Sequence, residues 1–308
     1  MRIVVMGAGG VGGYFGGQLA KAGHEVIFVA RGAHLAALQE RGLKVESSIA
    51  PLALTRVNAV EAPLATAPAD VVMFCVKLWD AESAAAQLAP VLAKGGVVIP
   101  FQNGVESHLI LRRALGAERV AGGVAHISAT IRSPGVIAHT GSMARLRVGS
   151  FNGETPEQVR AFADAGRAAG IDISAVPDIA RSLWEKFVLL VAMSGVCSLA
   201  RQPIGVVRRE PELRSTLLAS MLETVAVART QGIAFADDFA GKEMSFIDEL
   251  PPAMRPSMLN DLIAGKPLEA PWLAGAVARM GNEAKIAVPV NATIFAALKP
   301  WLNGAPPA

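Results

Sequence analysis

The stretch Arg2-Ile-Val-Val-Met-Gly-Ala-Gly-Gly-Val-Gly12 decides the fold of the N-terminal half of the chain. Its apolar run predicts a strand, and its glycines follow the spacing G-x-G-x-x-G at the opening of a predicted helix. The first glycine of such a turn permits a tight bend, the second lets the backbone approach a pyrophosphate, and the third lets the helix pack closely on the strand. The helix N-terminus attracts the negative charge of the ligand. The predicted cofactor-binding residues of this turn are Gly7, Ala8, Gly9, Gly10, Val11 and Gly12.

Strand and helix patterns alternate on the C-terminal side of this turn. β-branched runs recur at 26–29, 71–76 and 97–100, separated by helical patterns near 11–22, 33–41, 80–93 and 105–115. Further β-like runs at 119–131, 136–140 and 145–149 precede a helix over 155–169, capped by Thr155, and a short strand at 171–174. Alternation of this kind predicts βαβ units and a parallel sheet. We therefore expect an α/β fold with an N-terminal Rossmann-type doubly wound sheet.

The pattern changes after Val176, where helices follow one another without strands. Asp178 is predicted to cap a long helix that runs to Leu199. Proline and glycine separate the remaining helical patterns, which lie at 210–231, 239–249, 256–264, 269–286 and 289–299. We therefore expect a Rossmann domain over 1–176, which binds the dinucleotide, and an all-α C-terminal domain over 177–308, which holds the substrate and the catalytic groups.

The composition of the 308-residue chain narrows the class of protein. Hydrophobic residues make up 52%, enough for two cores, while the net charge is only +3 and no basic run supports nucleic acid as a partner. Cys75 and Cys197 lie in apolar segments and are expected to be buried free thiols of a reducing compartment. The chain opens directly on a strand pattern, and its longest apolar stretch, 187–200, is shorter than a bilayer span. We expect a cytoplasmic protein without membrane contact.

The end of the second predicted strand indicates which dinucleotide binds. Phe28-Val-Ala is followed by Arg31, and no acidic residue is adjacent in the sequence to bind the ribose hydroxyls of NAD. A guanidinium at this place suits a 2′-phosphate, so the sequence favours NADP (NADPH), although an ordinary surface arginine would give the same pattern. The five histidines show no metal-ligand spacing, and His126 and His139 are expected to be structural.

Polar residues follow two further predicted strands. Lys77 ends the apolar run that contains Cys75, and Asn103 follows the next run in Phe101-Gln-Asn-Gly104. Both therefore fall at the carboxyl edge of the sheet, where ligands of doubly wound sheets bind. Each residue also has a plain structural explanation, a solvated strand end for Lys77 and an Asn-Gly turn for Asn103.

The predicted helical domain holds an unusual lysine. Lys186 opens an apolar run, and its spacing places Lys186, Leu190 and Ser194 on one face of a helix. Desolvation of a lysine lowers its pKa toward the range of a general acid, whereas a helical lysine is more often a surface residue. Glu269, in the first turn of a predicted helix, and Ser257, at a predicted N-cap, have helix-end explanations as well.

Taken in order, these residues resemble the ketopantoate reductase (2-dehydropantoate 2-reductase) family, and the resemblance runs from Gly7 to about Leu298. The glycine turn is generic, but the ordered set of the other marks is specific. These marks are Arg31, Val-Lys77, Gln-Asn103-Gly, Trp-Glu-Lys186, Ser257-Met-Leu-x-Asp261, and Glu269 followed by a helix that ends in Ile286-Ala-Val-Pro289.

The resemblance implies a reaction and a role for each marked residue. NADPH would deliver hydride to the C2 carbonyl of 2-dehydropantoate and give pantoate, a step of pantothenate and coenzyme A biosynthesis. Lys186 would be the general acid, and Glu269 would lie beside the nicotinamide and the substrate. The resemblance assigns cofactor contacts to Asn103, Lys77 and Ala129, and substrate contacts to Asn103, Lys186, Ser194 and Ser257.

Three positions depart from the family pattern. Leu190, Ser194 and Ile204 stand where family members carry asparagines, so polar contacts to a hydroxylated substrate are lost. A reductase of a more apolar 2-oxo acid is therefore an alternative, and so are a non-catalytic NADP-binding sensor and a β-hydroxyacid or sugar-phosphate dehydrogenase. The helical domain has enough apolar surface for a homodimer, although no dimer seam is identifiable.

Overall fold

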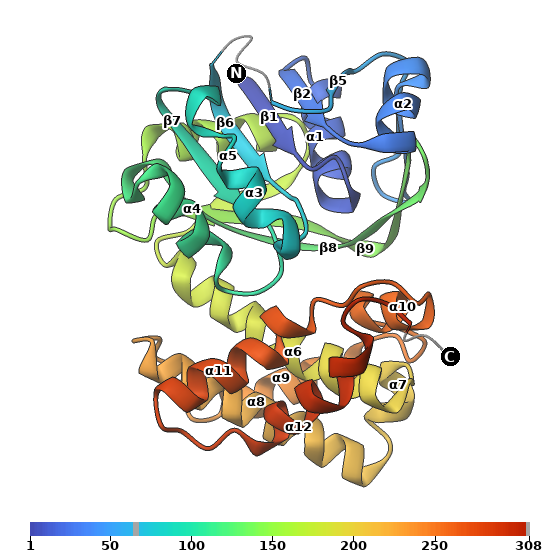
Figure 1. Cartoon of the computed structure of the whole chain (residues 1–308), viewed down its shortest axis with the longest axis vertical. Coiled ribbons are helices and arrows are strands. Elements are labelled where there is room, and N and C mark those ends of the chain that lie inside the picture. Colours follow the sequence, from blue (N-terminus) through green and yellow to red (C-terminus); the bar gives the residue numbers. More distant parts are fainter. Residues whose placement is uncertain (64–67, 306–308) are drawn as a thin grey trace. The chain divides into compact units, whose positions relative to one another are not determined.

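A computed structural model describes residues 1–63 and 68–305 of the chain. Its contacts divide these residues into two compact units (Figure 1). The first unit comprises Met1–Gln102 and Glu106–Ser182, and the second comprises Asn103–Val105 and Leu183–Ala308. The short excursion at 103–105 makes Asn103 part of the second unit, although it directly follows the sheet of the first.

The first unit is built on a parallel five-stranded sheet, as predicted. Its strand order is β5-β2-β1-β6-β7, and every neighbouring pair is parallel. The strands are β1 (Arg2–Met6), β2 (Glu25–Val29), β5 (Asn58–Val60), β6 (Ala69–Phe74) and β7 (Leu92–Pro100). The connecting helices are α1 (Gly10–Lys21), α2 (Gly32–Arg41), α3 (Ala81–Ala85) and α4 (Ser107–Leu115), and α5 (Glu157–Ala168) follows later.

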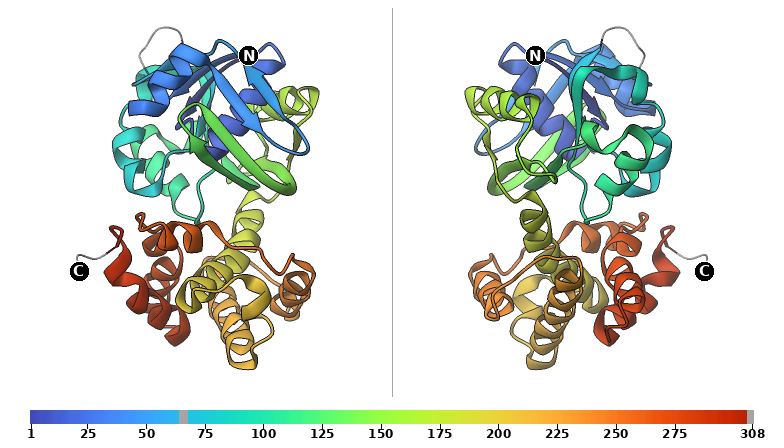
Figure 2. Two further views of the ribbon diagram at one scale, coloured as in Figure 1. Left: turned by 90° about the vertical axis from the view of Figure 1, so that its right-hand side faces the viewer. Right: turned by 90° about the vertical axis from the view of Figure 1, so that its left-hand side faces the viewer.

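A second sheet of the same unit packs on the other side of α1. It runs in the order β10-β9-β3-β4, with β8 paired to β9, and Figure 2 shows the two long green strands of this hairpin side by side. A methyl group at Gly16 would touch Val5 of the first sheet, and one at Gly17 would touch Leu43 of the second, so α1 fits between the sheets because it lacks side chains there. The strands are β3 (Leu43–Glu46), β4 (Leu52–Leu54), β8 (Gly122–Ser133), β9 (Val136–Gly149) and β10 (Asp172–Ala175).

Several predicted elements of this unit were wrong in extent. The helix expected over 80–93 is only α3 with flanking 3₁₀ turns at Leu78–Asp80 and Ala89–Val91, since Pro90 cannot continue a helix. The two strands expected at 136–140 and 145–149 form the single strand β9, which pairs with β8 on both sides of an irregularity that contains the positive-φ Gly141. Thr155 does not cap α5; Pro156 occupies the N-cap, since a residue before proline is held in extended backbone.

The second unit is helical throughout its described residues. Asp178 caps the long helix α6 (Ile179–Ala200) as predicted, accepting a 2.9 Å hydrogen bond at Oδ1 from the Arg181 backbone N–H. Glu223 holds the start of the last helix, since its carboxylate accepts the backbone N–H groups of Val290 and Asn291 at 2.8 and 2.9 Å. The other helices are α7 (Ile204–Val207), α8 (Pro211–Thr230), α9 (Phe239–Glu249), α10 (Ser257–Ile263), α11 (Ala274–Glu283) and α12 (Pro289–Leu298).

Helix α6 extends beyond the apolar run at 187–200. With 22 residues it is long and apolar enough, by length and composition alone, to cross a membrane, so the sequence argument that it is too short was wrong. The helix begins at Ile179, as the predicted cap at Asp178 requires, whereas the argument against a membrane span counted only the apolar run at 187–200. However, 67% of its most apolar window is buried inside the protein, as in the core helix of a soluble domain.

Candidate active site

The glycine turn has the close packing that its sequence predicts. Gly7 adopts φ +102°, and the N–H groups of Gly7 and Ala8 both donate to the Val29 carbonyl at 3.2 and 2.9 Å. A Cβ at Gly12 would lie 2.2 Å from the Gly7 carbonyl oxygen, so only glycine lets α1 begin this close to β1. Gly9 is the N-cap of α1 and provides no side-chain cap, which leaves the first N–H groups of the helix for an anion.

The strand β8 closes one side of this turn. A Cβ at Gly10 would lie 2.0 Å from the carbonyl oxygen of Ala129, and the half-buried Ala129 thus packs directly against the start of α1. The position that the family resemblance assigned to the cofactor is therefore next to the glycine turn, although it lies in the other sheet of the unit.

Arg31 follows β2 as the N-cap of α2, and an acidic side chain lies beside it. Its Nη1 lies 3.6 Å from Oδ1 of Asp80, with the two side chains 59% and 37% exposed. The sequence around Arg31 offers no acidic residue, but the fold brings Asp80 to it from the loop after β6. A 2′-phosphate at Arg31 would have to compete with this carboxylate and would be repelled by it.

Replacing Asp80 by asparagine tests this competition. We expect Asp80→Asn to strengthen NADP⁺ binding about three- to tenfold, because a like charge is removed from beside the phosphate, while NAD⁺ binding changes little. Dissociation constants of both cofactors would be measured for the wild type, Asp80→Asn and the control Asp164→Asn, an exposed carboxylate of α5. Equal gains for NAD⁺ and NADP⁺ would contradict a phosphate site at Arg31.

Lys77 lies beyond the strand that was expected to contain it. Strand β6 ends at Phe74, and Lys77 is the exposed N-cap of the 3₁₀ turn that follows. Its ammonium lies 5.4 Å from the centroid of the Trp79 ring, a cation–π contact that restrains it at the carboxyl edge of the sheet. Cys75, two residues before Lys77, was expected to be buried, but the residue as a whole is partly exposed. Its thiol group is nevertheless desolvated, which raises its pKa.

Three side chains of the second unit form a hydrogen-bonded chain. The Nζ of Lys186 donates to Oδ1 of Asn103 at 2.9 Å, and Nδ2 of Asn103 donates to Oε2 of Glu269 at 3.3 Å. The orientation of the amide follows from its neighbours, since an ammonium can only donate and an ionised carboxylate can only accept. Residues from the loop after β7, from α6 and from the segment before α11 thus meet at one place.

Glu269 is 6% exposed and does not lie in the first turn of an α-helix as predicted. It precedes a 3₁₀ turn at Ala270–Trp272, and α11 begins only at Ala274, because Pro271 interrupts the expected helix. The carboxylate of Glu269 therefore accepts a hydrogen bond from Asn103 and precedes a short 3₁₀ turn rather than a long helix.

The surroundings of Lys186 change its acidity. Burial lowers the pKa of Lys186 to about 8, and the negative charge of Glu269 opposes this shift. An ammonium with this pKa is protonated at neutral pH and can give up its proton more readily than an exposed lysine. The arrangement can therefore donate a proton to an oxygen atom that gains negative charge.

The other residues assigned to the substrate are not part of the hydrogen-bonded chain Lys186–Asn103–Glu269. Ser194 is fully buried and its hydroxyl has no hydrogen-bond partner among the described residues, while Ser257 is exposed as the first residue of α10, after the N-cap Pro256. Ile204 is fully buried on α7, and Leu190 is half-buried one helical turn after Lys186. The helix face that begins at Lys186 is therefore apolar at its next position.

Two further polar residues of the first unit were not predicted as site residues. Gln102 is 8% exposed, and within the described part of the chain neither polar atom of its amide has a hydrogen-bond partner. His34, in the first turn of α2, bonds to the glycine turn itself. Within residues 1–63 and 68–305, no group of three or more His, Cys, Asp or Glu side chains could hold a metal ion. His139 is structural as expected, bonded to Ser47 and the Met143 carbonyl.

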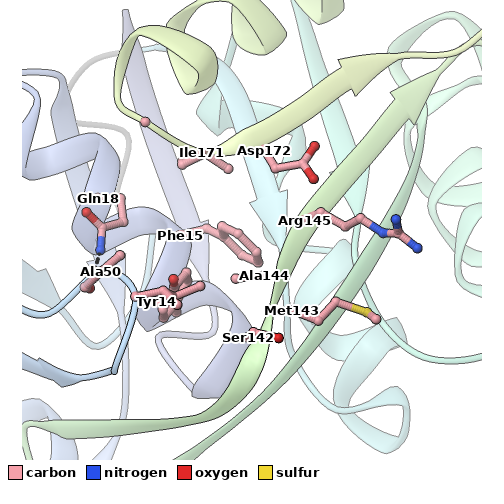
Figure 3. Close-up of a pocket in the computed structure, with 12 residues that line it drawn as sticks. Tyr14, Phe15, Gln18, Ala50, Ser142, Met143, Ala144, Arg145, Ile171 and Asp172 are labelled. Carbon is pink, nitrogen blue, oxygen red and sulfur yellow. Dashed lines mark hydrogen bonds between the residues drawn. The ribbon is translucent and has the colours of Figure 1, made fainter. Parts of the chain in front are cut away.

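The first unit also contains a pocket that is lined by other residues (Figure 3). It measures about 480 Å³ and is closed on one side by Gln18, whose amide donates to the Ala50 carbonyl at 2.8 Å. None of the predicted site residues lines it, so it is not the candidate site. Its lining comes from α1, the segment at 49–50, β9 and the start of β10, with Tyr14, Phe15, Ser142, Met143, Ala144, Arg145, Gly170, Ile171 and Asp172.

Comparison with protein-family models gives matches over both parts of the chain. Residues 3–153 match "Ketopantoate reductase PanE/ApbA", and residues 178–301 match "Ketopantoate reductase PanE/ApbA C terminal". A 2-dehydropantoate 2-reductase of Archaeoglobus fulgidus is 33% identical over 294 residues, which covers 96% of this chain and 95% of that protein.

Solved structures give the same picture. A PanE/ApbA family ketopantoate reductase from Ralstonia eutropha JMP134 superimposes with a TM-score of 0.88 at 34% identity and covers 98% of both chains. A D-mandelate dehydrogenase solved with NADH and anilino(oxo)acetate has a TM-score of 0.90 and covers 98% of both chains. Its identity is only 20%, so that likeness is one of fold.

Proposed function

Because the chain belongs to the ketopantoate reductase family, whose members are NAD(P)-dependent oxidoreductases that act on CH–OH groups, we propose that it reduces 2-dehydropantoate to pantoate with NADPH. The observation that carries the proposal is the chain Lys186–Asn103–Glu269, in which a partly desolvated ammonium is held by an amide. A ketone oxygen that gains charge needs such a positioned donor.

Each side chain has a defined task in this proposal. A bound reduced nicotinamide would supply the hydride for the new C–H bond at C2. Lys186 gives its proton to the carbonyl oxygen as the C=O double bond becomes a C–O single bond, so one hydride and one proton are added. Asn103 positions the Lys186 ammonium, and Glu269 fixes the amide of Asn103 from its other side. The glycine turn and Arg31 are proposed to hold the pyrophosphate and the 2′-phosphate.

The substrate itself has a second candidate. Leu190 presents an apolar side chain one turn from Lys186, and the fully buried Ile204 offers no polar group either, which favours a 2-oxo acid with an apolar side chain. Ser194 and Ser257 remain proposed substrate contacts, Ser257 for the carboxylate. The same fold occurs in D-mandelate dehydrogenase, an enzyme named for an aryl 2-hydroxy acid.

A substrate panel decides between these candidates. NADPH oxidation would be followed with 2-dehydropantoate and with branched and aromatic 2-oxo acids, for the wild type and Leu190→Asn. If the substrate is apolar, we expect Leu190→Asn to lower kcat/KM for it about tenfold and to raise the ratio in favour of 2-dehydropantoate. Cofactor binding without turnover of any 2-oxo acid would support the sensor instead, and oxidation of a hydroxy acid or sugar phosphate alone would support a dehydrogenase.

We further propose a cytoplasmic enzyme whose partner is a small 2-oxo acid, with no nucleic acid or membrane. The net charge of +3 and the two free cysteines support this setting. A homodimer is proposed through exposed apolar residues of the helical unit, such as Leu218 and Leu222, which are 36% and 49% exposed and lie one turn apart on α8.

A further inference from the structure

His34 connects the glycine turn to a distant hairpin. Its Nε2 lies 2.9 Å from the Ala8 carbonyl oxygen, and its Nδ1 lies 3.1 Å from the backbone nitrogen of Gly135. Gly135 forms the turn between β8 and β9, which rises toward α2 in Figure 1. The Gly135 carbonyl in turn accepts a 2.9 Å hydrogen bond from the Lys44 N–H, so the hairpin end is fixed on both sides.

The two partners determine the state of the imidazole ring. The Gly135 N–H can only donate, so Nδ1 must be the unprotonated, accepting nitrogen. The single proton of a neutral ring then lies on Nε2 and is donated to the Ala8 carbonyl. A doubly protonated ring would set an N–H group against the Gly135 N–H and break this bond. The observed geometry therefore requires neutral His34.

The bond to Ala8 bears directly on the orientation of the turn. In a trans peptide the carbonyl of Ala8 and the N–H of Gly9 point in opposite directions. Holding the Ala8 carbonyl at His34 therefore fixes the direction of the Gly9 N–H, which belongs to the N-cap of α1. This N–H is one of the groups that a pyrophosphate at the helix N-terminus would need.

We propose that His34 is a positioning residue of the cofactor turn, which binds the dinucleotide tightly only while the His34 ring is neutral. The inference rests on the proposed binding of the cofactor pyrophosphate at this turn. It makes cofactor affinity dependent on pH through a residue of the fold that does not itself touch the reacting atoms.

The pH dependence of cofactor affinity is expected to come from protonation of the His34 ring and not from neighbouring charges. Burial lowers the pKa of His34 from 6.5, and the Ala8 carbonyl opposes the shift. Charged side chains on neighbouring elements form the ion pairs Lys44–Glu46, Arg132–Glu46, Arg31–Asp80 and Arg41–Glu40, and Glu61 follows β5. None of these charges is a cause of the lowered pKa of His34. Affinity is therefore complete above pH 6.5 and is lost as the pH falls through the lowered pKa of His34.

The test compares NADP⁺ binding by the wild type and His34→Gln between about pH 8 and about pH 5. The 2′-phosphate of NADP⁺ also titrates, but it does so for both proteins, so the ratio of their dissociation constants isolates His34. We expect the wild type to lose about tenfold more affinity than His34→Gln across this range. His24→Gln, at the other end of α1, should keep the wild-type profile.

Calorimetry on the wild type and His34→Gln provides a second measurement. In two buffers of different ionisation enthalpy, NADP⁺ binding near about pH 6 should release protons, because the complex favours neutral His34. Equal pH profiles for the wild type and His34→Gln, or equal proton release by both, would overturn the inference while leaving cofactor binding intact. Failure of the wild type to bind NADP⁺ or NAD⁺ at about pH 8 would overturn the proposed function, and this inference with it.

Discussion

Lys186→Ala is expected to lower kcat for 2-oxo-acid reduction by about 10²–10⁴-fold, the usual contribution of a positioned general acid. Deletion of the side chain leaves the amide of Asn103 without its donor and the substrate oxygen without a proton source. The loss should lie mainly in kcat, because the proton transfer stabilises the transition state more than the bound substrate. The dissociation constant of NADP⁺ should change little, since the glycine turn belongs to the other unit.

A matched lysine controls for loss of charge. Lys242 lies on α9 of the same unit and pairs with Asp238 at 2.8 Å on the surface, so Lys242→Ala should keep wild-type kcat. Steady-state rates of both variants with the best substrate of the panel would be compared. Full activity of Lys186→Ala would remove Lys186 from the proposed reaction, while the family assignment would stand.

The pH dependence gives an independent check on the same residue. Lys186 must carry its proton to act, and its pKa is lowered to about 8, so kcat/KM should be constant below pH 8 and fall about tenfold per pH unit above it. Glu269→Gln removes the charge that raises this pKa. The alkaline limb of the variant should therefore move to lower pH, and an unchanged limb would exclude Lys186 as the titrating group.

The sequence predicted the architecture of both units, although the long helical patterns at 80–93 and 269–286 were wrong in extent because each contains a proline. The glycine turn, the parallel sheet and the helical unit were predicted from the hydrophobic periodicity and from the glycines and prolines between elements. Helix α9 was predicted with its observed bounds. The strands β3, β4 and β5 were missed, since three or four residues rarely carry a readable alternation, although the equally short β10 was predicted to within one residue of its bounds. The predicted domain boundary at residue 176 and the roles of the site residues stay predictions, and the contacts divide the chain inside α6.

The contacts of the site depended on packing across long stretches of sequence. Asn103 and Glu269 are separated by 166 positions, and only the fold brings their side chains together. The same holds for His34 and Gly135, separated by 101 positions, and for Arg31 and Asp80. Family resemblance could point to Asn103, Lys186 and Glu269 individually, but no spacing rule predicts a hydrogen bond between them. His34 had no such help, since an isolated histidine in a helical pattern is unremarkable.

Gly10→Ala and Gly9→Ala form a pair that separates folding from cofactor binding. A Cβ at Gly10 would lie 2.0 Å from the Ala129 carbonyl oxygen, a backbone atom that cannot rotate away, whereas a Cβ at Gly9 would meet nothing within 4 Å. We expect Gly10→Ala to destabilise the protein by about 3 kcal/mol or more, because α1 or β8 must shift. Gly9 has φ −76°, which any residue adopts, so Gly9→Ala should keep its melting temperature.

Gly9→Ala, the more stable variant of the pair, should nevertheless bind the cofactor much more weakly than the wild type. The open space at Gly9 faces the start of α1, and a methyl group there would occupy the room that lets a pyrophosphate approach the backbone. We expect Gly9→Ala to weaken NADP⁺ binding by about 10²-fold, equivalent to about 2.7 kcal/mol. Thermal unfolding with and without NADP⁺ measures both effects together. Wild-type cofactor affinity in Gly9→Ala would mean that the space at Gly9 is not filled by the pyrophosphate, and the anion would then have to bind at another part of the turn.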